Sequence, residues 1–231
     1  MALSKNDRGI YDPVMTEAGM VGRRTNRRGL ATRENMLEAA LKSLASGEPG
    51  SVSANRIAKD VGATWGAVKY QFGDIDGFWA AVLHRTAEGR ATLLSATPQP
   101  DTPLHRRVGR IIDTLYHGLS SDDSRAIENL RAALPRDPDE LERLYPLTAA
   151  ELFSWSRSWL ETCRRAFAGL DIPSERVREV AALIPGAVRG LVSERQLGSY
   201  ADLDVARATL TEALVAYLDQ PTDEASRSRR R

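Results

Sequence analysis

Residues 53–72, SANRIAKDVGATWGAVKYQF, constrain the fold more than any other part of this chain, because they predict two short helices separated by a tight turn. Ser53 can accept a hydrogen bond from an unpaired backbone N–H at the start of the first helix. Apolar residues then recur with helical spacing. Gly62 follows the last of them, where a left-handed backbone ends a helix without steric cost. The segment therefore predicts a helix-turn-helix.

The second helix of this motif is predicted to begin after Thr64, whose hydroxyl can cap it. Val68 and Phe72 lie four residues apart and would anchor the helix to the rest of the protein. In helix-turn-helix proteins the second helix enters the DNA major groove, so its outward residues are candidate DNA contacts. An ordinary helical hairpin at a solvent-exposed corner is the alternative that this segment leaves open.

A longer amphipathic helix is predicted over residues 32–44, TRENMLEAALKSL, with its apolar residues on one stripe. Thr32 would cap this helix and Gly47 would end it. A short loop then leads into the helix-turn-helix.

Together these elements resemble the DNA-binding domain of the tetracycline-repressor (TetR) family of bacterial transcriptional regulators. The resemblance covers about a fifth of the chain and lies in Arg33…Met36-Leu37…Ala40, Val52-Ser53…Ile57-Ala58…Gly62 and Thr64…Gly66…Val68…Phe72, followed by a helix from about Ile75. It implies an all-α fold in which a three-helix DNA-binding domain precedes a larger helical domain for effector binding and dimerisation. It also implies a transcriptional repressor that a small-molecule effector releases from its operator.

The sequence departs from the family pattern at positions that matter for DNA binding. Family members usually carry a Tyr seven residues after the turn glycine, which donates to a phosphate, whereas here Lys69 stands there and Tyr70 follows. Lys69 can still meet a phosphate as a point charge. Ile75 replaces a basic residue that is common near the start of the fourth helix. Trp65 is large for a base-facing position, and packing against the protein is an equal alternative.

These considerations divide the candidate DNA contacts into two groups. Phosphate contacts are predicted for Ser53, Thr64 and Lys69, and contacts to base edges for Asn55, Trp65, Gly66 and Tyr70. Gly66 belongs to the second group because a residue without a side chain permits close approach. Arg27 and Arg28, which precede the first predicted helix, would enter an adjacent minor groove or lie along phosphates, with a solvated basic tail as the alternative.

The charge distribution supports a nucleic-acid partner for the N-terminal part. The net charge of the 231 residues is only +1. Residues 1–73, however, contain 11 Lys or Arg against 7 Asp or Glu, while the remaining residues contain 21 against 24. The positive charge therefore lies with the helix-turn-helix, as phosphate binding requires.

The rest of the chain is also predicted to be helical, because no strand-like alternation or hairpin signal persists. The proline-rich segment TPQPDTP predicts a connecting loop, and Pro185 predicts a kink. Helices are predicted over residues 104–120, 125–134, 139–170, 174–196 and 203–218. The predicted domains are a flexible basic arm (1–29), the DNA-binding domain (30–75), an effector-binding and dimerisation domain (76–220) and a disordered basic tail (221–231).

The last two helices are predicted to form a homodimer interface, because their apolar stripes contain small residues that allow close approach. TetR-like proteins pair the corresponding helices across a two-fold axis. The candidate interface residues are Ala181, Ile184, Val188, Leu191, Leu210, Leu214 and Tyr217. Some of this surface must be intramolecular core, and the sequence does not divide the two uses. A dimer would place two recognition helices about 34–36 Å apart, in successive major grooves of a near-palindromic site.

An effector pocket is predicted among the central helices. Aromatic area and a few polar groups make Tyr116, Asn129, Phe153, Trp155 and Trp159 its candidate lining. Their chemistry favours an apolar or aromatic effector. For any one of them, a place in the hydrophobic core is the alternative.

Enzymatic activity is not predicted. The three histidines show no metal-ligand spacing and no nucleophile motif, and there is no phosphate-binding glycine loop, so neither a metal nor a cofactor is expected. The single Cys163 excludes an intramolecular disulfide and suits the reducing cytoplasm, and no apolar run is long enough to span a membrane. The remaining alternative is a helical protein-interaction module without sequence-specific DNA binding.

Overall fold

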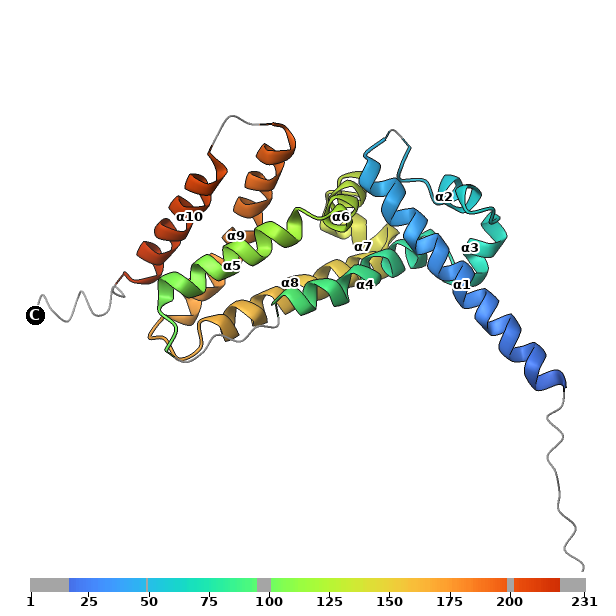
Figure 1. The fold of residues 1–231 in the computed structure, drawn as a ribbon, viewed down its shortest axis with the longest axis horizontal. Coiled ribbons are helices and arrows are strands. Elements are labelled where there is room, and N and C mark those ends of the chain that lie inside the picture. Colours follow the sequence, from blue (N-terminus) through green and yellow to red (C-terminus); the bar gives the residue numbers. More distant parts are fainter. Residues whose placement is uncertain (1–16, 49, 95–100, 199–201, 221–231) are drawn as a thin grey trace, which may run out of the picture.

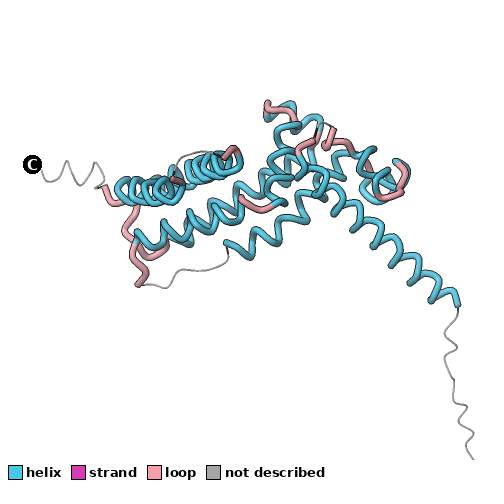
Figure 2. The backbone as a smooth tube through the Cα atoms, turned by 45° about the horizontal axis from the view of Figure 1, so that its top comes forward, coloured by secondary structure: helices cyan, strands magenta, loops and turns pink. Residues whose placement is uncertain are grey.

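The computed structural model describes the backbone of residues 17–48, 50–94, 101–198 and 202–220, and the side chains in these ranges except those of residues 17–28 and 88–94. Within the described residues the secondary structure is entirely helical (Figures 1 and 2). The helices are α1 (Glu17–Ser46), α2 (Ala54–Asp60), α3 (Trp65–Phe72), α4 (Ile75–Leu94), α5 (Leu104–Leu119), α6 (Asp122–Ala133), α7 (Pro138–Leu144), α8 (Pro146–Ala166), α9 (Ser174–Gln196) and α10 (Leu203–Leu218). The predicted all-α fold is confirmed.

Helix α1 is longer than the sequence predicted. It begins at Glu17, so the predicted cap at Thr32 is wrong, and the backbone of residues 17–29 continues the helix instead of starting a separate arm. No proline interrupts this stretch, so every backbone amide in it can donate to the helix. The end is as predicted, because α1 stops at Ser46 and Gly47 takes a φ of +66°. Figure 1 shows the first turns of α1 projecting beyond α2 and α3.

Helices α2 and α3 form the predicted helix-turn-helix. Ser53 caps α2 by accepting from the Arg56 amide at 3.4 Å, and Thr64 caps α3 by accepting from the Ala67 amide at 3.3 Å. Between them, Gly62 has a φ of +69°. The local chemistry that predicted these boundaries therefore operates in the folded chain.

The predicted helix over residues 139–170 is two helices, so that prediction is wrong. Pro146 has no amide hydrogen to continue α7, and a new helix, α8, begins there. Asp137 caps α7, and the start of α6 lies three residues earlier than predicted because Ser121 caps it. Helix α9 begins at Ser174, but Pro173 occupies the cap position, so Ser174 does not cap it. Helix α10 has the predicted bounds.

Two hydrophobic cores organise the molecule. Core 1 joins the helix-turn-helix to α1, α4 and α6, and its fully buried members include Met36, Val68 and Phe78. Core 2 is formed mainly by α5, α9 and α10 with the C-terminal half of α8. Helix α8 serves both cores, because Leu152 and Trp155 pack against core 1 whereas Trp159, Leu160 and Cys163 belong to core 2. In Figure 1 α8 lies alongside α4 and extends towards α9.

Cys163 is an inert core residue. Its side chain is fully buried in core 2, and burial raises the pKa of its thiol to about 12, because a thiolate would lose its hydration there. None of the described helices is long and apolar enough to cross a membrane.

Candidate nucleic-acid interface

The second helix of the motif, α3, is held firmly against the protein body. Val68 is fully buried in core 1, and the ring of Phe72 packs edge-on against Phe78 with centroids 4.9 Å apart. Arg33 of α1 lies over the ring of Phe72, with its guanidinium carbon 4.9 Å from the ring centroid. At the same end, the Gln71 side chain donates to the Gly29 carbonyl at 3.2 Å. These contacts fix the orientation of α3.

The outward face of α3 is open to solvent. Gly66, Lys69 and Tyr70 are exposed and, at spacings of three and four residues, share one side of the helix. Tyr70 leaves 87% of its surface exposed, which is unusual for a large aromatic residue on a well-anchored helix. Asn55 on α2 is exposed as well. An exposed aromatic residue beside a lysine, on a rigid helix, is suited to contact DNA bases and phosphates.

Three other predicted contacts are less accessible or already engaged. Ser53 is half-buried and Thr64 is exposed, and both hydroxyl oxygens accept the cap hydrogen bonds of α2 and α3. A hydroxyl that accepts such a bond can still donate to a phosphate. Trp65 is half-buried and packs against core 1, which is the second of the two roles predicted for it. The predicted DNA contacts of Arg27 and Arg28 concern side chains that lie outside the described residues.

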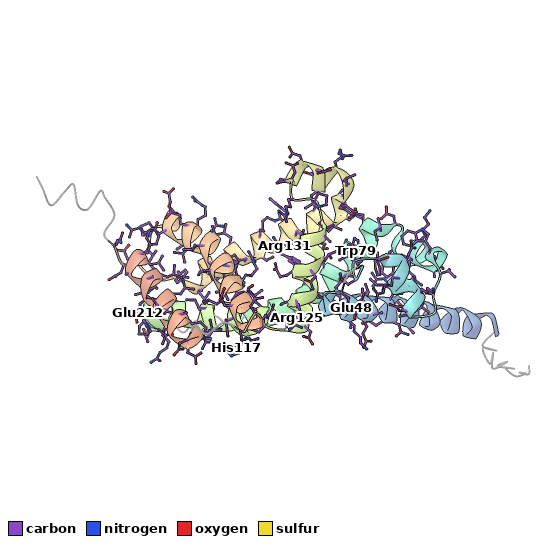
Figure 3. All side chains as sticks on the ribbon, turned by 90° about the horizontal axis from the view of Figure 1, so that it is seen from above. Glu48, Trp79, His117, Arg125, Arg131 and Glu212 are labelled. Carbon is purple, nitrogen blue, oxygen red and sulfur yellow. The ribbon has the colours of Figure 1, made fainter. Side chains whose placement is uncertain are left out.

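The structure adds basic residues that the sequence pattern did not single out. Lys59 is exposed in the last turn of α2. Arg56 is also exposed, and its guanidinium pairs with Glu48 at 3.0 Å. Figure 3 shows Glu48 and Trp79 within the N-terminal part of the molecule. Motif spacing alone could not identify Arg33 as a support of α3, because its contact with Phe72 joins residues that are distant in the chain.

The five predicted effector-binding residues lie in different parts of the structure. Trp155 packs against core 1, and Tyr116 is buried in core 2. Asn129 donates to the Leu44 carbonyl at 2.7 Å and so caps the end of α1. Trp159 donates to the Ala181 carbonyl at 2.6 Å, and Phe153 is 67% exposed. The described residues therefore do not bring these five side chains to one cavity.

An open groove of about 570 Å³ lies between α1, α4 and α6. Its wall is largely charged, with Glu38, Lys42, Arg85, Asp122, Asp123 and Arg125 among the lining residues. None of the predicted effector-binding residues lines it.

Four of the residues predicted for the dimer interface are buried within the single chain. Ala181, Ile184, Val188 and Leu214 are at most 3% exposed in core 2, so they cannot also form a surface for a second copy. Leu191, Leu210 and Tyr217 are half-buried against the same core. The prediction for the four buried residues is corrected because the apolar stripe of α9 faces α5 and α8 of its own chain, and Leu214 of α10 faces core 2, where α10 contacts α5 and α9.

Several apolar and small residues are exposed on the sides of α9 and α10 that face away from core 2, among charged residues such as Glu179 and Glu212. On α9 residues 183, 186 and 190 recur with helical spacing, Leu197 follows at the C-cap of the helix, and on α10 residues 205, 209, 213 and 216 recur in the same way. We call this surface the α9–α10 face; its residues are Leu183, Gly186, Gly190, Leu197, Val205, Thr209, Ala213 and Ala216. Leu183 is 55% exposed, Leu197 78% and Val205 60%. The glycines and alanines would allow another helix to approach closely.

The described residues therefore form a helix-turn-helix with an exposed second helix, joined to a helical body that has a second core. No family model and no curated protein matches the sequence. Among solved structures, the multidrug binding protein EbrR complexed with imidazole aligns over 82% of this chain and 91% of that chain, with a TM-score of 0.53 and 19% identity. A bacterial regulatory protein in the tetR family from Rhodococcus RHA1 aligns over 83% and 98%, with a TM-score of 0.58 and 14% identity. The chain therefore has the fold of a tetR-family regulator.

Proposed function

We propose that the protein is a homodimeric DNA-binding transcriptional regulator of the TetR type. The observation that carries this proposal is the outward face of α3, where Lys69 and the 87% exposed Tyr70 stand on a helix anchored to core 1. The fold shared with a tetR-family regulatory protein supports it. We further propose that it is a repressor acting in the cytoplasm, that its operator is near-palindromic, and that an apolar or aromatic small molecule releases it.

Selection of duplexes from a random DNA library at near-physiological salt tests the proposal. Enrichment of a two-fold-symmetric sequence is the expected result, because a dimer presents two copies of α3 to successive major grooves. A folded and dimeric sample that enriches no sequence would favour the alternative, a protein-interaction module that uses the same helices for another partner.

Two substitutions separate phosphate contacts from base contacts. Lys69→Ala is expected to weaken binding to all duplexes alike and to reduce the slope of log K against log salt by about 1, because one fewer phosphate is neutralised. Asn55→Ala is expected to relax the preference at particular base pairs by about 1–3 kcal/mol. Titrations of the selected duplex and its single-base variants, at several salt concentrations, measure both effects. A uniform loss of affinity in both variants would contradict this division of roles.

A further inference from the structure

The junction between α3 and α4 is rigid, so a force on the start of α4 reaches the recognition helix. The Asp74 carboxylate accepts from the Gly77 amide at 2.8 Å, and the Asp74 carbonyl accepts from the Phe78 amide at 3.1 Å. A methyl group at Gly77 would lie 2.0 Å from the Phe72 carbonyl oxygen, which shows how closely the two helices approach. Together with the edge-on contact between the rings of Phe72 and Phe78, these contacts hold α3 and the first turn of α4 together.

In that first turn, Asp76 binds a helix that begins 70 residues later in the chain. Its carboxylate accepts from the amides of Leu147 at 2.8 Å and Thr148 at 2.9 Å, and the Thr148 hydroxyl donates to the Asp76 carbonyl at 3.3 Å. Asp76 is only 5% exposed and Thr148 is fully buried. A carboxylate that accepts backbone amides at a helix N-terminus forms strong, charge-assisted hydrogen bonds.

Helix α8 takes its N-terminal cap from Asp76. Tyr145, at its own cap position, makes no side-chain cap hydrogen bond, and Pro146 has no amide hydrogen. The first amides that need a partner belong to Leu147 and Thr148, and both bind Asp76. The cap is therefore also a bond between the helix that follows α3 and a helix of the body.

The connection is important because α8 spans both cores. Its N-terminal half packs against core 1, and its C-terminal half packs in core 2 with α9 and α5. A displacement of α8 by events in core 2 would pull on Asp76 and, through the rigid junction, on α3. A side-chain bond also links two helices of core 1 elsewhere, where the Asn129 amide of α6 donates to the Leu44 carbonyl near the C-terminus of α1.

We propose that Asp76 is a positioning residue that fixes the orientation of the recognition helix by tying the α3–α4 junction to the N-terminus of α8. The consequence for DNA binding rests on the function proposed above. The hydrogen bonds between Asp76 and the N-terminus of α8 do not depend on that function, since they are a property of the folded protein that can be measured without DNA.

Hydrogen exchange followed by mass spectrometry on the full-length Asp76→Asn protein tests the proposal. Exchange is expected to become at least tenfold faster in peptides that contain Leu147 and Thr148 and also in peptides that contain Gly77 and Phe78, while peptides from α9 keep the wild-type rate. Val188→Ala, a truncation in core 2, is the control for a general loss of stability. It should leave unchanged the ratio of the exchange rate at the start of α8 to the exchange rate at the start of α4. Thr148→Val, which replaces the hydroxyl with a methyl group and leaves both amide bonds to Asp76, should give a smaller change in the same two regions and remains usable if Asp76→Asn fails to fold.

Two outcomes would overturn the proposal. Faster exchange confined to the start of α8 would show that Asp76 caps α8 locally and does not position α3. An equal acceleration throughout the chain would show that Asp76 only stabilises the whole protein.

If the library selection yields a site, duplexes with one base pair added between its halves provide a second measurement. The wild-type protein should reject them, and Asp76→Asn should discriminate at least tenfold less. Failure of the selection would leave the exchange result intact, so the two proposals fail separately.

Discussion

Gly77→Ala is expected to disrupt the junction between α3 and α4, because the added methyl group would overlap the backbone of Phe72. Its Cβ would lie 2.0 Å from the Phe72 carbonyl oxygen and 3.1 Å from the Phe72 carbonyl carbon, and both are backbone atoms that cannot rotate away. Either α3 or α4 must shift, at a cost of about 3 kcal/mol in the free energy of unfolding. Because the shift changes the orientation of α3, affinity for the selected duplex should fall at least tenfold. Chemical denaturation and DNA titration measure the two effects.

Gly66→Ala is the matched control for the stability measurement, since it adds the same methyl group to α3 itself. There the new Cβ would meet only the Thr64 hydroxyl oxygen, at 3.5 Å, which is ordinary contact. Alanine is the better helix former, so this variant should be more stable by about 0.5–1 kcal/mol. If Gly66 permits close approach to a base edge, as we propose, the stabilised variant nonetheless loses DNA affinity. Unchanged stability in Gly77→Ala would mean that the α3–α4 junction is more tolerant than its geometry indicates.

The features that could be predicted from the sequence depend on neighbouring residues. Caps at Ser53 and Thr64 and the left-handed backbone at Gly62 follow from contacts within three or four positions. The same is true of α10, where Asp202 accepts from the amides of Asp204 and Val205 and sets the first turn. The outward position of Lys69 and Tyr70 followed once Val68 and Phe72 were assigned to the inner side of α3.

Contacts between distant parts of the chain could not be predicted in this way. Asp76 and Thr148 carry no signal of their pairing, because an acidic residue in the first turn of a helix already has a local explanation in the helix dipole. Trp159 and Asn129 suited a pocket as a set of aromatic and polar side chains, yet each uses its N–H group on a backbone carbonyl of another helix. Residue type gave the chemistry of these side chains, but not their partners.

The interface between protomers shows a related limit. An amphipathic stripe indicates which side of a helix is buried, but not whether its own chain or a second copy covers it. On α9 the strongest stripe, through Ile184 and Val188, is fully buried by the protein's own helices. The exposed α9–α10 face, with Gly186 and Gly190, is weakly apolar and therefore less conspicuous in the sequence. It is the surface that we propose for the homodimer.

Leu183→Glu is expected to convert the protein into a folded monomer. Leu183 is 55% exposed in the single chain, so a carboxylate there costs the protomer little, whereas two copies facing each other across a two-fold axis would bury two unpaired charges. The dimer dissociation constant should rise at least a hundredfold, with the free energy of unfolding of the monomer almost unchanged. Sedimentation equilibrium gives the association state. The DNA affinity of the variant should also fall, because a monomer presents only one recognition helix whereas the dimer binds with two.

Two further variants make the result specific to this surface. Leu147→Glu changes a leucine that is equally exposed, at 54%, on α8, away from the α9–α10 face, and should leave the dimer intact. Ile184→Ala truncates a fully buried residue of the interface predicted from the sequence and should cost about 2–5 kcal/mol of stability within each protomer. The folded fraction of that variant should still dimerise. A protein that stays dimeric with Leu183→Glu but dissociates with Ile184→Ala, without loss of stability, would show that the buried stripe is the interface after all.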